Sequence, residues 1–572
     1  MILRSSNLIA AAFCCSAVPA LAVPPAWNHI PADAQVVISI PNLNALSESL
    51  NALETEYGVP MEDQGFDNIS MLLEFDGVNA GGSAAIAIMD VAAMGDGGEP
   101  PLVAIIPVSD YSAFVGNFQG TGDGVEQIWI EGMPIFVKNL DSGFAALGIS
   151  QDIVSNVGQG PTINPADLLG AIGVDMADSN DFLVVANIPA LSPFIQAGLA
   201  QLPNFAQNAA MMGGGPVEQM ESAFEMLEWL GGGIARDGKS LLFGIDVADD
   251  GITLNLGLQM VSGSEFGNYA TGGNGASKLL GRVPAKPFFM AGAIDLSGGG
   301  LIDLFKKLNE FNAKMAGGQA MPWLKVEQMQ EKVTGMSIVV GTPAAMMGGL
   351  LSETSVFMAS ADAAGLLALT QEVYNDMDGQ TVEGITYKTS YNPGVTEVDG
   401  ITIDEWSMGM QFDASNPMMA QSQMAIGMIF GPSGGPAGYA ASTEGGAVLT
   451  YSKSTANMSA AIKAANNGNG VSNAPGINAV SGNLPANRTF ECYMDLGQIA
   501  KSIMGLMAMM GGGGMPEIPE DLPPVAAGGT IDDGAVAIAI FIPKKTITGI
   551  RAALEPMGIG PADDNDGAPP RF

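Results

Sequence analysis

The chain has 572 residues, of which 47% are hydrophobic and 14% are charged. Its 21 basic and 59 acidic residues give a formal net charge of −38, which argues against binding to nucleic acid or to anionic lipid. The hydrophobic fraction excludes a chain that is disordered throughout, and the length provides for roughly two to four domains with real cores.

The first 22 residues have the pattern of a secretory signal peptide. Arg4 supplies the positive start, Leu8 to Val18 the apolar middle, and Ala20 to Ala22 the small-residue cleavage site. The mature chain is therefore expected to begin at Val23, and the protein to be exported to the periplasm, the cell envelope or the extracellular space. After this segment, no run of about 18 apolar residues lacks glycine or proline breaks, so no membrane span is predicted.

Cysteine usage fits an exported protein stabilised by burial alone. Cys14 and Cys15 lie inside the signal peptide, where Phe13 is too large for the position before a lipidated cysteine, so lipidation is disfavoured. Cys492 then remains as a single thiol, which excludes an intramolecular disulfide. Its alternation with apolar neighbours favours a buried thiol over a reactive one.

The stretch from Val36 to Leu53 introduces a pattern that the chain repeats. Val36 to Ile40 are β-formers, Asn42 is a candidate N-cap, and the apolar positions that follow recur at helical spacing. The first half continues with further predicted elements: strands 84–89, 102–108, 127–130, 135–138 and 144–149, helices 114–118, 151–157 and 217–230, and a hairpin of strands 241–247 and 252–260.

Later segments match earlier ones in the same order. Asn187, Asp295 and Asp495 each follow a strand-like run, as Asn42 does, and all four are interpreted as caps of the next helix. Pro284 can be laid on Pro31, an offset of 253, and Asp495 on Asn187, an offset of 308. The increase in offset places an insertion between about Thr381 and Pro436. This order predicts an internal duplication.

The predicted fold class is α+β, a tandem duplication of a mostly antiparallel β-sheet unit with amphipathic helices packed on it. The predicted organisation is a signal peptide (1–22), a first repeat domain (23–282), a second repeat domain (283–560) and a disordered acidic tail (561–572).

Three segments carry a resemblance: PADAQVVISIPNLNALSESL, FAALGISQDIVSNV and LLGRVPAKPFFMAGAIDL. They resemble uncharacterised exported bacterial proteins of the planctomycete type, which carry a domain of unknown function. The resemblance implies an envelope or secreted location and a fold of sheet and helices. It implies no catalytic residue.

The chain offers little for catalysis or for a cofactor. His29 is the single histidine, and nothing near it looks like a GxSxG nucleophile turn, which disfavours Ser-His and Cys-His catalysts as well as histidine-rich zinc sites. The glycine runs 213–215, 231–233 and 511–514 lack the P-loop lysine and are interpreted as flexible helix ends. No catalytic, cofactor-binding or metal-ligating residue is therefore predicted. Weak calcium binding by the acidic surface, including Asp563, Asp564 and Asp566, stays open.

Methionine provides the most concrete candidate for a functional surface. Methionines next to glycine, at helical spacing, form an adaptable apolar surface that could receive a lipid, a peptide or an envelope protein, whereas Cu(I) binding is disfavoured. The competing interpretation, which the sequence favours, is that the helices at 193–230 and 498–510 simply seal the core. The candidate residues are Met211, Met212, Met504, Met507, Met509 and Met510.

The sequence thus favours an exported, acidic, non-enzymatic protein of the envelope or the secreted fraction, with a binding or structural role. The alternative is a secreted hydrolase whose carboxylate-based site cannot be detected from residue spacing.

Overall fold

A computed structural model describes the fold. The described residues are 23–59, 67–95, 101–130, 132–205, 217–315, 325–343, 349–382, 385–412, 426–431, 434–509 and 518–555. The predicted signal peptide, the predicted acidic tail and much of the Met- and Gly-rich sequence lie outside these ranges.

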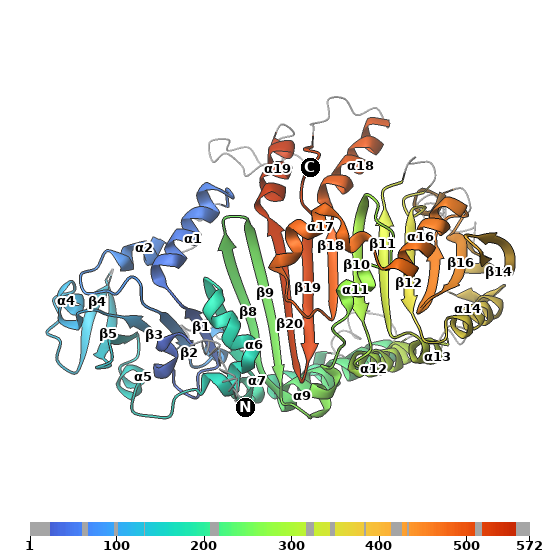
Figure 1. Cartoon of the computed structure of the whole chain (residues 1–572). Coiled ribbons are helices and arrows are strands. Elements are labelled where there is room, and N and C mark those ends of the chain that lie inside the picture. The colour runs from blue at the N-terminus through green and yellow to red at the C-terminus, as the bar shows by residue number, and fades with distance from the viewer. Residues whose placement is uncertain are drawn as a thin grey trace, which may run out of the picture.

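The described strands form one continuous sheet of twenty strands in which every pairing is antiparallel (Figure 1). The strand order across the sheet is β4-β5-β6-β3-β2-β1-β7-β8-β9-β20-β19-β18-β10-β11-β12-β17-β16-β15-β14-β13. The strands of the first half are β1 (Val36–Ile40), β2 (Ala84–Ile88), β3 (Leu102–Pro107), β4 (Val125–Ile130), β5 (Met133–Asn139), β6 (Phe144–Gly148), β7 (Phe182–Asn187), β8 (Gly238–Ala248) and β9 (Gly251–Met260). Those of the second half are β10 (Phe288–Asp295), β11 (Gly335–Gly341), β12 (Thr354–Ala359), β13 (Thr381–Val382), β14 (Ile385–Val398), β15 (Ile401–Phe412), β16 (Ala437–Thr443), β17 (Gly446–Thr450), β18 (Phe490–Met494), β19 (Val525–Asp532) and β20 (Ala535–Pro543).

The two halves of the chain meet at the seam between β9 and β20. The ladder runs from the pair Gly251–Pro543 to the pair Gln259–Ala535, and its middle pair is Asn255 with Ala539. Backbone hydrogen bonds therefore continue from one half into the other without a sheet edge between them.

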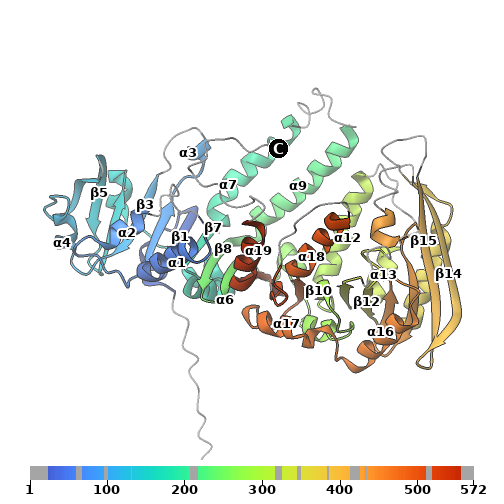
Figure 2. The same ribbon diagram turned by 90° about the horizontal axis from the view of Figure 1, so that it is seen from above.

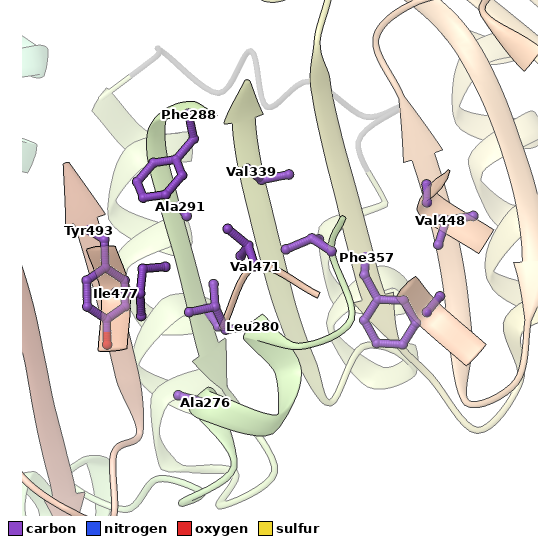
Figure 3. Packing of buried hydrophobic residues seen from close by; sticks show 14 of the residues in the cluster. Ala276, Leu280, Phe288, Ala291, Val339, Phe357, Val448, Val471, Ile477 and Tyr493 are labelled. Carbon is purple, nitrogen blue, oxygen red and sulfur yellow. The ribbon is translucent and has the colours of Figure 1, made fainter. Parts of the chain in front are cut away.

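One face of the sheet, called here the covered face, carries most of the core. Figure 2 shows α16 and α17 on this side of the sheet, opposite α7 and α9. The helices packed here are η1 (Pro25–His29), α5 (Gln151–Asn156), α6 (Pro165–Ser179), α11 (Ala276–Leu280), α16 (Thr455–Asn467), η5 (Val471–Asn473) and α17 (Pro475–Val480). In the second half, Leu280 and Ile477 pack against strand residues that include Val339, Phe357 and Tyr493 (Figure 3).

The opposite face, called here the open face, is covered mainly towards the two ends of the sheet. There α1, α4 and α14 bury Leu43, Phe114 and Leu366 against the strands. In Figure 1, α1, α19 and α18 follow one margin of the sheet and α9, α12 and α13 the other. The bounds of the helices that are not packed on the covered face are α1 (Leu43–Thr55), α2 (Asp67–Leu73), α3 (Ala92–Gly95), α4 (Tyr111–Gly116), α7 (Ile188–Leu199), α9 (Val217–Asp237), α10 (Glu265–Tyr269), α12 (Gly300–Met315), α13 (Val326–Lys332), α14 (Ala363–Met377), α18 (Leu496–Met509) and α19 (Lys544–Leu554). A short 3-10 helix, η6 (Ser481–Asn483), follows α17.

This architecture confirms the predicted α+β class with an antiparallel sheet and helices packed on it. Within the described ranges, no helix combines the length and the apolar character needed to cross a membrane.

Three of the four predicted strand-end caps are confirmed. Asn42 and Asn187 accept hydrogen bonds from the amides of Ala45 and Ala190, and Asp495 caps α18 in the same way. The prediction for Asp295 is wrong. Its carboxylate accepts from the amides of Ser297 and Gly275, and α12 begins only at Gly300, because the intervening Leu-Ser-Gly-Gly residues form a turn.

The glycine run 231–233 is also placed differently from the prediction of a flexible helix end. It lies inside α9, which continues to Asp237. A β-carbon at Gly233 would overlap the Phe266 ring, and one at Gly231 would lie 2.9 Å from Leu199 Cδ2. These glycines therefore allow α7 and α10 to pack closely on α9, which offsets the low helix propensity of glycine.

Candidate functional site: the open apolar face

Large apolar residues are exposed on the open face of the central strands. Leu241 and Phe243 of β8 alternate with Leu242, which is 1% exposed and points to the covered face. The same alternation puts apolar side chains on both faces of β9, β11 and β18, as in strands that are buried on both sides. Here one side is not buried. The exposed fractions on the open face are 50% for Leu241, 37% for Phe243, 37% for Leu256, 40% for Met336 and 39% for Met494.

Strand register aligns the open-face residues into two continuous rows across eight strands, β7 to β11 in sheet order. The first row joins directly paired residues: Val184, Phe243, Leu256, Ile538, Gly529, Phe490, Ile294 and Met336. The second row joins Phe182, Ile245, Leu254, Ile540, Ala527, Cys492, Gly292 and Ile338. We call these the apolar rows. Neither contains a charged or hydrogen-bonding side chain apart from the weakly polar thiol of Cys492.

The apolar rows are long. Seven interstrand steps of about 4.8 Å give each row a length of roughly 34 Å. Except for the two glycines, all their residues are partly or largely exposed to solvent. The rows cross the β9–β20 seam, so both halves of the chain contribute to one surface.

The helices that flank the open face also carry exposed apolar residues. Phe194 of α7 is 52% exposed, Leu227 of α9 46%, Phe305 of α12 43% and Ile503 of α18 54%. The helices α7, α9 and α18 contact open-face strands directly, and α12 packs against α9. The helical regions 193–230 and 498–510, for which the sequence left open a groove-covering or a core-sealing role, contribute α7, α9 and α18 to this border.

Acidic groups towards the ends of these strands are partly buried. Burial raises the pKa of Asp246 in β8, and the nearby carboxylates of Asp181 and Asp250 raise it further. Burial likewise raises the pKa of Asp495, at the end of β18, and of the Cys492 thiol in the second apolar row. For all three groups, burial is the main cause of the raised pKa.

The methionines predicted from the sequence are only partly located. Met504 is half-buried and packs on Ile518, Leu522 and Ala553, between α18 and α19. Met507 and Met509 belong to α18, but their side chains lie outside the described part of the structure. Met211, Met212 and Met510 also lie outside it. Sequence reasoning missed the exposed methionines Met336 and Met494, because their strands become neighbours of β10 only through the fold.

The structure brings His29 close to a hydroxyl that the sequence did not connect with it. Ser142 Oγ lies 2.9 Å from His29 Nε2. The His29 ring lines a pocket of about 600 Å³ and lies 5.1 Å from the Phe144 ring, centroid to centroid, at a tilt of 47°. Burial lowers the pKa of His29, which favours the neutral ring. Among the described residues, no carboxylate bonds the other ring nitrogen, so the acid that orients the imidazole of a catalytic triad is missing from this contact.

Over the described ranges, no group of three or more His, Cys, Asp or Glu side chains converges in a way that could hold a metal ion. The acidic residues of the tail, which the sequence left open for calcium, lie outside those ranges.

Comparison with known proteins adds no family. No family model and no curated protein matches the sequence. Three crystal forms of TP0453 are weakly similar in structure, with TM-scores of 0.20–0.21 and 8–9% identity, covering 42% of this chain and 79–81% of theirs. Similarity at this level supports no conclusion about fold or function.

Proposed function

We propose that this is an exported, non-enzymatic protein of the envelope or the secreted fraction that binds a hydrophobic ligand or partner on its open face. The observation that carries the proposal is the exposure of five large apolar residues on one face of the central strands. Contiguous exposed apolar surfaces are rare on soluble monomers and usually mark a site that binds a ligand, a membrane or another protein.

The alternative that helices seal this part of the core is less well supported. Sealing would leave open-face residues as buried as Leu242 or Val339, which are 1% and 0% exposed. Phe243 and Leu256 are instead 37% exposed although helices flank them on both margins of the sheet (Figure 1). The flanking helices thus leave the centre of the apolar rows exposed, although Phe182 at one end of the second row packs against the cluster that includes Leu43 and Leu46 of α1.

We further propose that the two halves, 23–282 and 283–560, arose by tandem duplication. Support comes from the strand order, since β4-β5-β6-β3-β2-β1-β7-β8-β9 corresponds step by step to β15-β16-β17-β12-β11-β10-β18-β19-β20. In this correspondence β13 and β14 are extra, and they fall inside the insertion expected between Thr381 and Pro436.

The register at the seam fits the same origin. The β8–β9 turn is closed by the pair Ala248–Gly251, and the β19–β20 turn by the pair Asp532–Ala535. Equivalent residues of the two hairpins are therefore 284 positions apart. With this offset, Asn255 is equivalent to Ala539, and these two residues form the middle pair of the seam. A unit that once paired with a second copy of itself through its last strand would produce this symmetric register.

Native mass spectrometry of the protein purified from its own host tests the binding role. The wild type is expected to retain a hydrophobic ligand or a partner. Leu256→Asn is expected to lose it, because ligand binding would remove water from the asparagine amide on the open face without providing a hydrogen-bond partner. Val395→Asn is the control, since Val395 is 44% exposed on β14, away from the apolar rows. An unliganded wild type, or equal retention by Leu256→Asn, would contradict the proposed role.

A further inference from the structure

The backbone of the open face limits what can lie on it. The six inner strands β8, β9, β20, β19, β18 and β10 are each paired on both sides, so their N–H and C=O groups are already used. An extended peptide lying on these strands would find no backbone partner for its own N–H and C=O groups. Each such group left without a partner in an apolar contact costs about 1–3 kcal/mol.

The side chains of the apolar rows impose the same limit. Leu254, Leu256, Ile538 and Ile540 form the centre of the two rows, on either side of the seam. They offer contact area and no hydrogen bond, so they favour an occupant whose contacting part is hydrocarbon. A hydrocarbon chain has no polar group that would need a partner there.

The dimensions of the surface also suit a chain. The hydrocarbon core of a bilayer is about 30 Å thick, or roughly 15 Å for each acyl chain. A row of roughly 34 Å is therefore long enough for one acyl chain on each half of the sheet. Phe194 of α7 and Ile503 of α18 are further exposed apolar residues, on helices that contact these strands.

Charge selects among ligands that carry such a chain. The chain as a whole has a net charge of −38, and Asp495 lies partly buried at the end of β18, one of the strands of the apolar rows. An anionic headgroup would be repelled by this field, whereas a neutral one would not.

From these observations, and resting on the proposed function, we propose that the occupant of the open face is a neutral long-chain lipid whose hydrocarbon chain lies along the apolar rows. A peptide, an amphipathic helix of a partner protein and an anionic lipid are the occupants against which it is tested.

Cys492 provides a reporter in the second apolar row. Its alkylation by N-ethylmaleimide at fixed pH is followed by mass spectrometry of the peptide that contains it, so that Cys14 and Cys15 do not interfere. The full chain is compared in the presence of hexadecanol, hexadecanoate or a synthetic amphipathic helical peptide. Hexadecanol is expected to slow alkylation of wild-type Cys492 at least about tenfold. In Leu256→Asn this protection should be about tenfold weaker, whereas in Val395→Asn it should equal that of the wild type.

The outcomes separate this inference from the proposed function. Protection by the peptide or by hexadecanoate, but not by hexadecanol, overturns the neutral-lipid assignment and leaves binding at the open face intact. If no probe protects Cys492 and the protein from its host carries nothing, both proposals fail. Equal protection of the wild type and Leu256→Asn by hexadecanol also overturns the assignment, because the chain would then lie elsewhere.

Discussion

Phe243 and Leu256 lie directly opposite each other on β8 and β9, and each is 37% exposed. The next residue on β8, Leu242, is 1% exposed and belongs to the core of the covered face. A single step along the strand therefore separates a residue that stabilises the fold from one that is available for binding.

This relationship predicts unequal costs for two adjacent truncations. Leu242→Ala should lower the free energy of unfolding by about 2–5 kcal/mol, because it leaves a cavity in a packed core. Leu241→Ala, at a residue that is 50% exposed, should cost less than about 1 kcal/mol. Urea denaturation of the two variants measures the difference, and equal costs would mean that the open face is packed in solution.

The glycine run in α9 predicts opposite effects of the same substitution at neighbouring positions. Gly233→Ala should destabilise by about 1–3 kcal/mol, because the added methyl group overlaps the Phe266 ring, which packs against the Trp229 ring at a centroid distance of 4.9 Å. Gly232→Ala meets no atom within 4 Å and should stabilise the helix by about 0.5–1 kcal/mol. Thermal unfolding of both variants checks the sign, and a stabilised Gly233→Ala would refute the packing of α9 on α10.

The pKa of Asp246 predicts a pH-dependent gain from removing its charge. Because burial and Asp181 raise this pKa above its ordinary value of 3.8, the folded state holds the proton more tightly than the unfolded state. The stability contributed by protonation is full below 3.8 and is lost as the pH rises through the raised pKa. Asp246→Asn should therefore have a higher Tm than the wild type at pH 7, and the difference should shrink towards pH 4.

Asp362 is the control for this titration, since its pKa is shifted in the other direction. Hydrogen bonds from Lys332 and from the Gly365 amide lower it, so its charged form stabilises the fold above the ordinary pKa and that stability is lost on acidification. Asp362→Asn should lower the Tm at pH 7. If both variants shifted the Tm in the same direction, the assignment of the two environments would be wrong.

The core of the second half contains a buried ion pair. Glu491 is 2% exposed and accepts hydrogen bonds from Arg488 at 2.6 Å, from Tyr493 at 3.0 Å and from Ser277 at 3.1 Å. Glu491→Gln leaves the guanidinium without its counter-charge and should cost about 3–5 kcal/mol in chemical denaturation. Glu225→Gln, which removes the partner of exposed Lys314, should change stability little. Equal effects would show that the Glu491 pair is hydrated.

Local structure could be read from the sequence where the signal was local. The strand Val36–Ile40, the caps Asn42 and Asn187 and the hairpin turn after Ala248 depend on residues close together in the chain. The cap at Asp295 was mispredicted because the glycines after it delay the helix, and the type of residue alone does not show that delay.

The candidate site could not be read in the same way. The apolar rows continue from β9 into β20, which comes more than 200 residues later, and only the seam register aligns Leu256 with Ile538. An apolar residue on both faces of a strand predicts burial on both sides, so the sequence of β8 gives no sign that Phe243 is exposed. The contact between His29 and Ser142 could not be predicted either, because the two residues are 113 positions apart in the chain.

The most direct test of the central claim is photo-crosslinking in the native host. p-Benzoylphenylalanine replaces Phe243 on the open face in one strain and Val395 on β14 in another, both at exposed positions. The proposed binding role predicts a defined adduct with a hydrophobic ligand or a partner at position 243 and none at position 395. Absence of an adduct at 243, or the same adduct at both positions, would contradict the assignment of the open face as the binding surface.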